Sequence, residues 1–408
     1  MLTLALSRRN AEEIDFVWGA TESHIASWRA SVNPDVVLAK YIPYTRDPAP
    51  RPGANTNLPW WQAHHPSLVL YTADRKTPAW ECFAGEGCAH VSVPLDLTNP
   101  ATLAYQIENA VAPAAAAGYS AIALDNYGVR NAWNASGAWK GPHGEWVELY
   151  ASKDDARYTR DVLNWTARAV DAIHAHGLLV IPNYGEENLT DPSVSSVVAL
   201  VDGVLREGGF THWNPIPNSS SFKTPPLKTT PSRFAQDVAF ARQLQRRGKA
   251  IYTINEWGAG PDFGLNPSKV PYNISAAYGG AAHANRAIRQ FVVATYMIIN
   301  GGASGIFLTC VQCYGGNAGG VGGLSLWPEY TAAVGSALEE AAVNAQSGVW
   351  HRAYTGGLAL VNPTAQSQSY ALPAGCDWSD LYGGDVPPGA LELAPASGLV
   401  LTRSHRRQ

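Results

Sequence analysis

The sequence predicts an α/β protein whose core is a (β/α)8 TIM barrel, followed by a small C-terminal antiparallel β domain. Short apolar runs alternate with helical stretches eight times along the chain. Continuous apolar strands of this kind are typical of parallel strands that are buried on both faces. Most predicted βα loops are longer than the αβ loops, which favours the closed barrel. The alternative, a doubly wound open sheet, usually has a Gly-rich first turn, and no such turn follows the first predicted strand.

The eight predicted strands are short apolar runs that end in loops. They cover Ile14–Gly19, Val36–Ile42, Leu68–Ala73, Ala121–Asp125, Leu178–Asn183, Val201–Glu207, Ala250–Asn255 and Ser304–Thr309. The clearest predicted helices between them are Asp154–His176, Arg233–Arg247 and His283–Asn300. In the first of these, apolar residues recur at helical spacing and Gly177 is the expected stop.

A change in the sequence pattern marks the end of the predicted barrel. After a last predicted helix at Glu329–Ala345, the chain has short alternating runs that Pro and Gly separate. We therefore predict a barrel at 1–346, a β domain at 347–402 and a disordered basic tail at 403–408. A β domain of about 55 residues is expected to need docking on the barrel to be stable. Its predicted strands are Leu358–Val361, Ser369–Leu372, Leu391–Leu393 and Leu399–Leu401.

The charge content excludes some function classes. Charged residues are 15% of the chain and the net charge is -4, so there is no general attraction to nucleic acid or to an anionic membrane. The longest apolar run, Phe291–Ile299, is too short to span a bilayer. The 14 Trp and 18 Tyr residues suit either a cleft for neutral, hydroxyl-rich ligands or a large aromatic core.

No convincing metal or cofactor site emerges. His174 and His176 end a helix just before a strand, on the face opposite to the βα loops. The loop Gly315–Gly323 lacks a phosphate-binding Lys and Ser/Thr pair, so a mobile lid is the better interpretation. A zinc site is disfavoured because Cys82 and Cys88 follow predicted strand three and Cys310 and Cys313 follow strand eight, and these two strands are not neighbours around a barrel. Local disulfides or free thiols are the better interpretation, and the disulfide pairing of these four cysteines stays open. We expect no metal and no organic cofactor.

The compartment and the oligomeric state stay open. The first ten residues place their charges after a short apolar run, the reverse of a secretory signal. The protein is therefore expected to be cytoplasmic, or secreted if a leader was removed.

Two acids stand at the ends of predicted strands, where barrel enzymes carry their reacting groups. Strand alternation places Ala121, Ala123 and Asp125 on one face. On the sixth strand, Leu205 and Glu207 share a face in the same way. A carboxylate that ends an apolar strand is costly unless it is paired or functional. A structural role, as a helix cap or as an ion pair with Arg206, is the alternative for each acid alone. For both acids together, we predict a functional pair.

Two facing carboxyl groups in an aromatic-rich barrel suggest hydrolysis of glycosides. One acid protonates the leaving oxygen, while the other attacks the anomeric carbon or activates water. Glu256 is the main rival, but alternation with Thr253 favours Asn255 as the inward residue. We keep Glu256 as a substrate-contacting candidate. Glu186 and Glu187 lie beyond their strand and are expected to be loop or helix N-terminal acids.

The remaining predicted contacts are aromatic and polar side chains near the strand ends. Loop Trp residues suit the C–H faces of sugar rings, although Trp is also often buried in barrels. Tyr41 ends the second strand and offers a hydroxyl to a sugar. The predicted substrate-binding residues are Tyr41, Trp61, Trp80, Asn126, Asn183, Arg206, Asn255, Glu256 and Trp257.

Several segments resemble the glycoside-hydrolase-like family 15, which takes its name from its barrel. They lie at Trp61–Tyr71, Val93–Pro100, Gly118–Asn126, Gly144–Tyr150, Val201–Glu207 and Thr355–Pro363. The resemblance implies a (β/α)8 glycosidase fold, and similar barrels take the nucleophile from strand four and the acid/base from strand six. Carried over, Asp125 is the nucleophile and Glu207 the proton donor. The chain departs from the resemblance at Asp74–Lys76, where relatives favour a glycine turn.

The sequence therefore predicts a glycoside hydrolase that cleaves O-glycosidic bonds of an oligo- or polysaccharide. The alternative is a carbohydrate-binding barrel without catalysis. A lyase or isomerase acting on a phosphorylated sugar would need basic residues in the last βα loops, and none stands out there.

Overall fold

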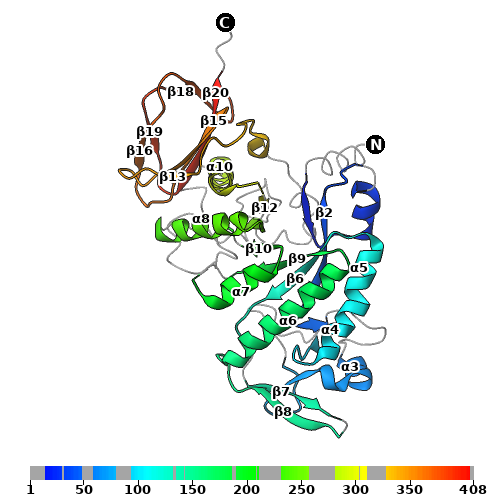
Figure 1. The fold of residues 1–408 in the computed structure, drawn as a ribbon. Coiled ribbons are helices and arrows are strands. Elements are labelled where there is room, and N and C mark those ends of the chain that lie inside the picture. The colour runs from blue at the N-terminus through cyan, green and yellow to red at the C-terminus, as the bar shows by residue number, and fades with distance from the viewer. Residues whose placement is uncertain are drawn as a thin grey trace. The chain divides into compact units, whose positions relative to one another are not determined.

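The computed structural model describes residues 14–29, 32–47, 58–79, 93–131, 135–141, 143–185, 190–207, 209–210, 231–256, 281–302, 304–309 and 328–404 (Figure 1). The chain forms two compact units, Met1–Val204 and Leu205–Gln408. None of the described helices is long and apolar enough to cross a membrane.

The central element is a parallel sheet of seven described strands, which gives the α/β barrel class that the sequence predicts. The strand order is β1-β2-β6-β9-β10-β11-β12. Parallel registers are present for β1–β2, β2–β6, β6–β9 and β11–β12. Seven of the eight predicted strands are thereby confirmed. Their bounds are β1 Phe16–Trp18, β2 Val37–Pro43, β6 Ala121–Tyr127, β9 Leu179–Tyr184, β10 Gly203–Glu207, β11 Ala250–Glu256 and β12 Ser304–Thr309.

The predicted third barrel strand, Leu68–Ala73, is wrong as a barrel element. Its residues form β4 (Leu70–Thr72), which pairs antiparallel with β7 (Ser136–Lys140), while β2 pairs directly with β6. This run is buried in a separate hydrophobic core that contains Leu68, Val69 and Tyr71. A short apolar run has the same sequence pattern whether it is buried in a parallel sheet or in a small separate core.

The segments after β2 and after β6 build this loop subdomain together. Its sheet has the order β4-β7-β8, and a second, two-stranded ribbon pairs β3 with β5. The buried carboxylate of Asp96 accepts two hydrogen bonds from Thr98 and forms an ion pair with Lys140 at 3.0 Å. Lys140 thereby ties β7 to the segment after β5. The other elements of the subdomain are β3 Arg46–Asp47, α3 Leu58–His64, the 3-10 turn Pro66–Leu68, β5 Val93–Pro94 and β8 Glu145–Tyr150.

Helices cover one face of the strands in the first unit. The long helix α6 (Ala156–Ala175) confirms the predicted helix at 154–176, and Asp155 is its N-cap, accepting a hydrogen bond from the Arg157 amide at 2.9 Å. Helix α4 (Pro100–Gln106) begins after the N-cap Asn99 and has Pro100 at its first position, where a missing amide hydrogen costs nothing. The remaining helical segments are α2 Glu22–His24, the π-helical turns Ile25–Arg29 and Ile107–Val111, α5 Ala112–Ala117 and α7 Pro192–Leu200.

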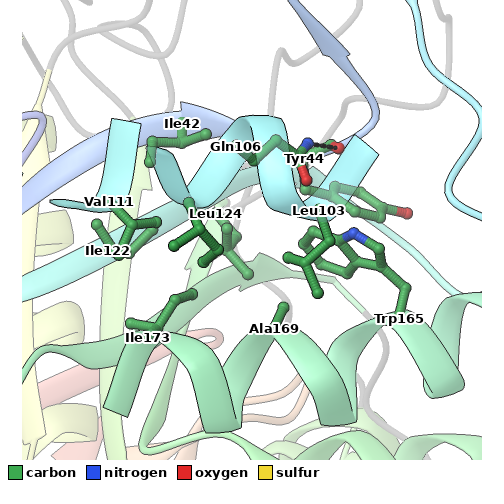
Figure 2. A pocket seen from close by; sticks show the side chains of 11 residues that line it. Ile42, Tyr44, Leu103, Gln106, Val111, Ile122, Leu124, Trp165, Ala169 and Ile173 are labelled. Carbon is green, nitrogen blue, oxygen red and sulfur yellow. Dashed lines mark hydrogen bonds between the residues drawn. The ribbon is translucent and has the colours of Figure 1, made fainter. Parts of the chain in front are cut away.

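The contact between β6 and these helices sets the direction of its side chains. Ile122 and Leu124 lie with Val111 and Ile173 around a small apolar pocket between the strands and the helices (Figure 2). Because successive side chains of a strand point to opposite faces, Ala123 and Asp125 face away from the helices. The pocket is therefore a part of the helix-side core.

The second unit contains two more barrel helices and the C-terminal strands. Helices α8 (Pro231–Arg246) and α10 (Ala281–Ile299) confirm the predicted helices at 233–247 and 283–300. A six-stranded sheet has the order β13-β14-β15-β20-β17-β18, and β16 pairs with β19. The four predicted C-terminal strands are confirmed. The strands are β13 Ala342–Val343, β14 Trp350–Tyr354, β15 Gly357–Asn362, β16 Gln368–Ala371, β17 Asp377–Asp380, β18 Asp385–Val386, β19 Ala390–Leu393 and β20 Ser397–Ser404.

The predicted helix Glu329–Ala345 is wrong. Only a 3-10 turn forms at Pro328–Thr331, and β13 follows. Gly335 has a φ of 77°, which a right-handed helix does not accommodate. The buried Glu329 carboxylate is bound by the Arg289 guanidinium of α10 at 2.7 Å, which directs this segment onto α10. The predicted domain boundary at residue 346 stays a prediction; the division of the chain into its two compact units falls at Val204 and Leu205, within β10.

Helix α10 packs directly against the C-terminal sheet. A Cβ atom on Gly398 of β20 would lie 2.7 Å from the Phe291 Cα and 2.9 Å from the Ala294 Cβ of α10. On β14, Arg352 donates hydrogen bonds to the Met297 and Asn300 carbonyls at the end of α10. The sheet therefore binds the carbonyl groups that the helix end leaves without an internal partner.

We expect Gly398→Val to destabilise the protein by about 1–3 kcal/mol, because the added atoms must displace the α10 backbone. Urea unfolding followed by circular dichroism measures this change. Gly185→Ala is the control, because a Cβ there meets nothing within 4 Å. Equal stability of the two variants would contradict the close packing of β20 on α10.

We expect Asp155→Asn to reduce the acid sensitivity of unfolding. Hydrogen bonds from the Arg157 side chain and from the Ala151 and Arg157 amides hold the pKa of Asp155 well below its usual range. Its contribution is therefore present above the unfolded pKa and is lost as the pH falls through the folded one. Asn caps helices as well as Asp but does not titrate.

The measurement is urea unfolding of both proteins at neutral pH and at pH ~3, just below the unfolded pKa of Asp. The stability advantage of the wild type should shrink in acid. The same difference at both pH values would contradict the role of the Asp155 charge.

Candidate active site

Asp125 lies near the end of β6, on the face away from the helices. Its helix-side neighbour Leu124 is buried with Trp165 and Ile173 of α6 (Figure 2). The pairing of β6 with β9 shifts register between Leu124 and Tyr127, and Asn126 has a φ of 55° in this bulge. A bulge changes the side to which later residues point. Asp125 therefore keeps the interior face, although Tyr127, two residues later, bonds to the helix.

Three polar side chains hold the Asp125 carboxylate. Tyr41 of β2 donates its hydroxyl to Oδ2 at 2.6 Å, and Asn183 of β9 donates its amide to Oδ1 at 2.9 Å. Asn126 donates to Oδ2 at 3.1 Å. The structure thus brings together four residues that the sequence analysis selected, from three adjacent strands. All three partners donate, so the carboxylate is the acceptor in each of these hydrogen bonds.

Buried tyrosines support this site from the helix side. The Tyr44 hydroxyl donates to the Gly128 carbonyl at 2.8 Å and so holds the segment after β6. The Tyr127 hydroxyl and Thr166 of α6 are 2.6 Å apart. Burial raises the pKa of Tyr44 and of Tyr127. Both phenols therefore stay neutral and keep the hydroxyl hydrogen that these bonds need.

Glu207 is the last residue of β10 and is half-buried. The preceding residue, Arg206, is only 2% exposed and forms an ion pair at 3.4 Å with Asp237 of α8. The Arg206 guanidinium also lies 5.3 Å from the centre of the Phe240 ring of α8. Because Arg206 points to the helix, strand alternation directs Glu207 to the opposite face.

The position of Arg206 does not support its predicted contact with substrate. Its charge is neutralised by Asp237 in a buried environment. Breaking a buried ion pair leaves an uncompensated charge and is strongly destabilising. We assign Arg206 to the packing of β10 against α8. The ion pair of Arg206 shown here is with Asp237 of α8, which is not one of the strand-end acids considered as its partner in the sequence analysis.

Asn255 of β11 faces the same side as Thr253, as alternation predicts, but it is fully buried. Its side-chain oxygen accepts a hydrogen bond from the Phe210 amide at 2.7 Å, three residues after Glu207. A Cβ atom on Gly209 would lie 2.7 Å from this oxygen. The burial does not support a direct substrate contact by Asn255. The sequence analysis missed the link to Phe210, although the two glycines directly after the strand-end acid were a signal for a close backbone approach.

Trp61 is fully buried in the core of the loop subdomain, together with Leu68 and Leu95. Its ring lies 4.7 Å from that of Tyr105. Trp60, Trp139 and Trp146 pack against the same core. The placement of Trp61 therefore does not support its predicted contact with a ligand. The segments after β2 and β6 are long enough to enclose a core of their own, and these indole rings pack in or against that core.

Several predicted residues lie outside the described part of the chain. Trp80 and Trp257 are among them, and so is the side chain of Glu256, whose backbone ends β11. The predictions for Glu186, Glu187, the loop Gly315–Gly323 and the four cysteines Cys82, Cys88, Cys310 and Cys313 also lie outside it.

The His174 imidazole binds the Asp202 carboxylate at 2.8 Å, at the end of α6. The same Asp202 oxygen accepts the Val180 amide at the start of β9. His174 is thus placed at the amino end of the strands, away from Asp125, as the sequence analysis expects. In the described residues no group of three His, Cys, Asp or Glu side chains could hold a metal ion.

Comparisons with known proteins give a structural likeness only. No protein-family model matches the chain, and no curated protein sequence matches it. A maltogenic alpha-amylase from Thermotoga neapolitana is similar, with a TM-score of 0.50 at 11% identity over 99% of this chain and 94% of that one. An alpha-amylase from Malbranchea cinnamomea has a TM-score of 0.50 at 11% identity, over 98% and 88% of the two chains.

Isomaltulose synthase from Klebsiella sp. LX3 has a TM-score of 0.51 at 11% identity, over 94% of this chain and 85% of that one. Likenesses at this identity show the barrel fold. The resemblance to the glycoside-hydrolase-like family 15 stays a prediction.

We expect Trp61→Ala to destabilise the protein by about 3–5 kcal/mol, because it leaves a large cavity in a closed core. Trp61→Phe keeps most of the packing and should cost less. Denaturant unfolding measures both changes. A surface tryptophan that serves a ligand would give little loss of stability in either variant, and that result would contradict the structural role.

Proposed function

We propose that the chain is a glycoside hydrolase that cleaves O-glycosidic bonds of an oligo- or polysaccharide. Asp125 is the proposed nucleophile and Glu207 the proposed acid/base. The observation that carries the proposal is the Asp125 carboxylate, held on the interior face of β6 by hydrogen bonds from Tyr41, Asn126 and Asn183.

The contacts of Asp125 suit a group that attacks carbon or activates water. Its hydrogen-bond partners donate to both oxygens. They are neutral groups, so they orient the carboxylate without pairing it with a positive charge. A nucleophile that is already oriented loses little entropy when the substrate binds. The same negative charge stabilises the oxocarbenium-like transition state of glycoside cleavage.

Glu207 suits the complementary role of proton donor. It ends β10 with its side chain half-buried, and strand alternation turns it away from Arg206, whose guanidinium is paired with Asp237. A general acid must keep its proton near neutrality. The proposal requires that Asp125 and Glu207 face one substrate, and their separation then decides between retention and inversion.

The proposed substrate contacts lie around Asp125. The Tyr41 side chain is 39% exposed while its hydroxyl is bound to the carboxylate, so the ring can pack against a sugar that reaches Asp125. Asn126 and Asn183 are half-buried beside it. Trp80, Trp257 and Glu256 complete the proposed set, and neither a metal nor an organic cofactor is part of the mechanism.

The structural likenesses support the carbohydrate class. Two of the similar structures are alpha-amylases and one is isomaltulose synthase. The fold they share with this chain is a barrel that carries its reacting groups at the carboxyl ends of the strands, where Asp125 and Glu207 lie.

We expect Asp125→Asn and Glu207→Gln each to lower hydrolysis at least ~10³-fold on a panel of oligosaccharides. On glycosides with a dinitrophenyl leaving group, which departs without a proton, Glu207→Gln should keep much more activity than Asp125→Asn. Reducing-sugar release and dinitrophenolate absorbance measure the two reactions. The anomer of the first product, observed by NMR, tells whether Asp125 acts as nucleophile or as base.

Glu145→Gln is the matched control, because Glu145 is an exposed acid of β8. It should leave hydrolysis unchanged. Glycan binding by the wild type without turnover would instead favour a carbohydrate-binding barrel. A single acid variant with full activity would remove that residue from the mechanism.

A further inference from the structure

We infer that Asn255 is a positioning residue for the proposed proton donor Glu207, and that it acts by holding the backbone of the turn after β10. This inference rests on the proposed function. The juxtaposition that carries it is a fully buried amide side chain on β11 bonded to the Phe210 amide, three residues after Glu207.

The hydrogen bond from Phe210 fixes the path of the chain after β10. Phe210 is itself buried, so its amide hydrogen has no access to water and depends on the Asn255 oxygen at 2.7 Å. Loss of a buried acceptor leaves that donor unsatisfied, which costs more than the hydrogen bond itself contributes. The backbone would therefore move to find another partner.

Gly209 shows how closely the two segments approach. An added Cβ would lie 2.7 Å from the Asn255 oxygen and 2.8 Å from the Thr253 Cβ. Gly209 thus lies directly against the side chains of β11, where an added Cβ would displace one of the two segments. Because Gly209 and Phe210 follow Glu207 by two and three residues, a shift of their backbone changes the direction of the Glu207 side chain.

The Asn255 side chain is itself held in place. Its amide nitrogen donates to the Thr253 hydroxyl at 3.3 Å, on the same face of β11. Strand β11 is in register with β12 over six residue pairs, from Ile251 to Glu256. Asn255 therefore projects from a rigid strand, which is what precise positioning of a partner requires.

A position error at Glu207 would affect proton donation selectively. Misplacement of a reacting group by about 1 Å can cost ~10²-fold in rate. This loss applies only where the leaving group needs a proton. A substrate with a dinitrophenyl leaving group avoids the step, so it reports whether the rest of the site is intact.

The test compares Asn255→Ala with Asn255→Asp on both substrate types. A buried carboxyl takes up a proton to stay neutral, and its carbonyl oxygen can still accept the Phe210 amide. Asn255→Ala should lose ~10²-fold in kcat/KM on natural oligosaccharides but less than ~3-fold on dinitrophenyl glycosides. Asn255→Asp should recover most of the lost activity on oligosaccharides.

Thr102→Val is the matched control, because it removes a buried side-chain hydrogen bond, from Thr102 of α4 to the Asp96 carbonyl, and leaves Asn255 and the bond to Phe210 in place. It should lower stability without the dependence on the leaving group. Denaturant unfolding at the assay temperature verifies that each variant is folded; if Asn255→Ala is not, Asn255→Ser replaces it, because its shorter side chain does not reach the Phe210 amide.

Equal losses on both substrate types, or equal losses in the Asp and Ala variants, would overturn the positioning role. Its failure is distinguishable from failure of the proposed function. If only the positioning role fails, Glu207→Gln shows the dependence on the leaving group and Asn255→Ala does not. If the proposed function fails, the wild type cleaves neither substrate.

Discussion

The packing of helix-side residues against the strands is the constraint on which the rest of the structure depends. On β6, Ile122 and Leu124 are buried against helices (Figure 2); on β10, Arg206 is buried against α8 through Asp237. A strand that commits alternate residues to one side has no freedom in directing the others. The direction of Asp125 and of Glu207 is therefore a consequence of residues that take no part in chemistry.

The bulge in β6 solves a local conflict. Regular alternation would place Asp125 and Tyr127 on the same face, yet Tyr127 bonds to Thr166 of α6. The left-handed backbone of Asn126 absorbs the extra residue. Asn is among the few residues other than Gly that adopt this conformation at low cost. The same residue then donates its side-chain amide to Asp125, so one position serves both backbone geometry and the site.

Much of the barrel was predictable because its elements have strong local patterns. The alternation on β6 and the periodicity of α6 are visible in sequence, and so are the residues around Asp125. The loop subdomain was not predictable, because the run at Leu68 has the same appearance in either kind of core. The burial of Trp61 in this core was not predictable either, because a loop tryptophan has the same appearance in sequence whether it faces a ligand or a small core. The helix predicted at Glu329–Ala345 failed because a tertiary ion pair to Arg289 and the backbone of Gly335 outweigh its helical pattern.

The contact between α10 and the C-terminal sheet has a consequence for the order of events during synthesis. The carbonyls at the end of α10 are bound by Arg352, and its flank is covered by Gly398 of β20. A nascent chain exposes that helix end and flank until about a hundred further residues have left the ribosome. Helix α10 therefore completes its packing only after the strands that cover it have been translated.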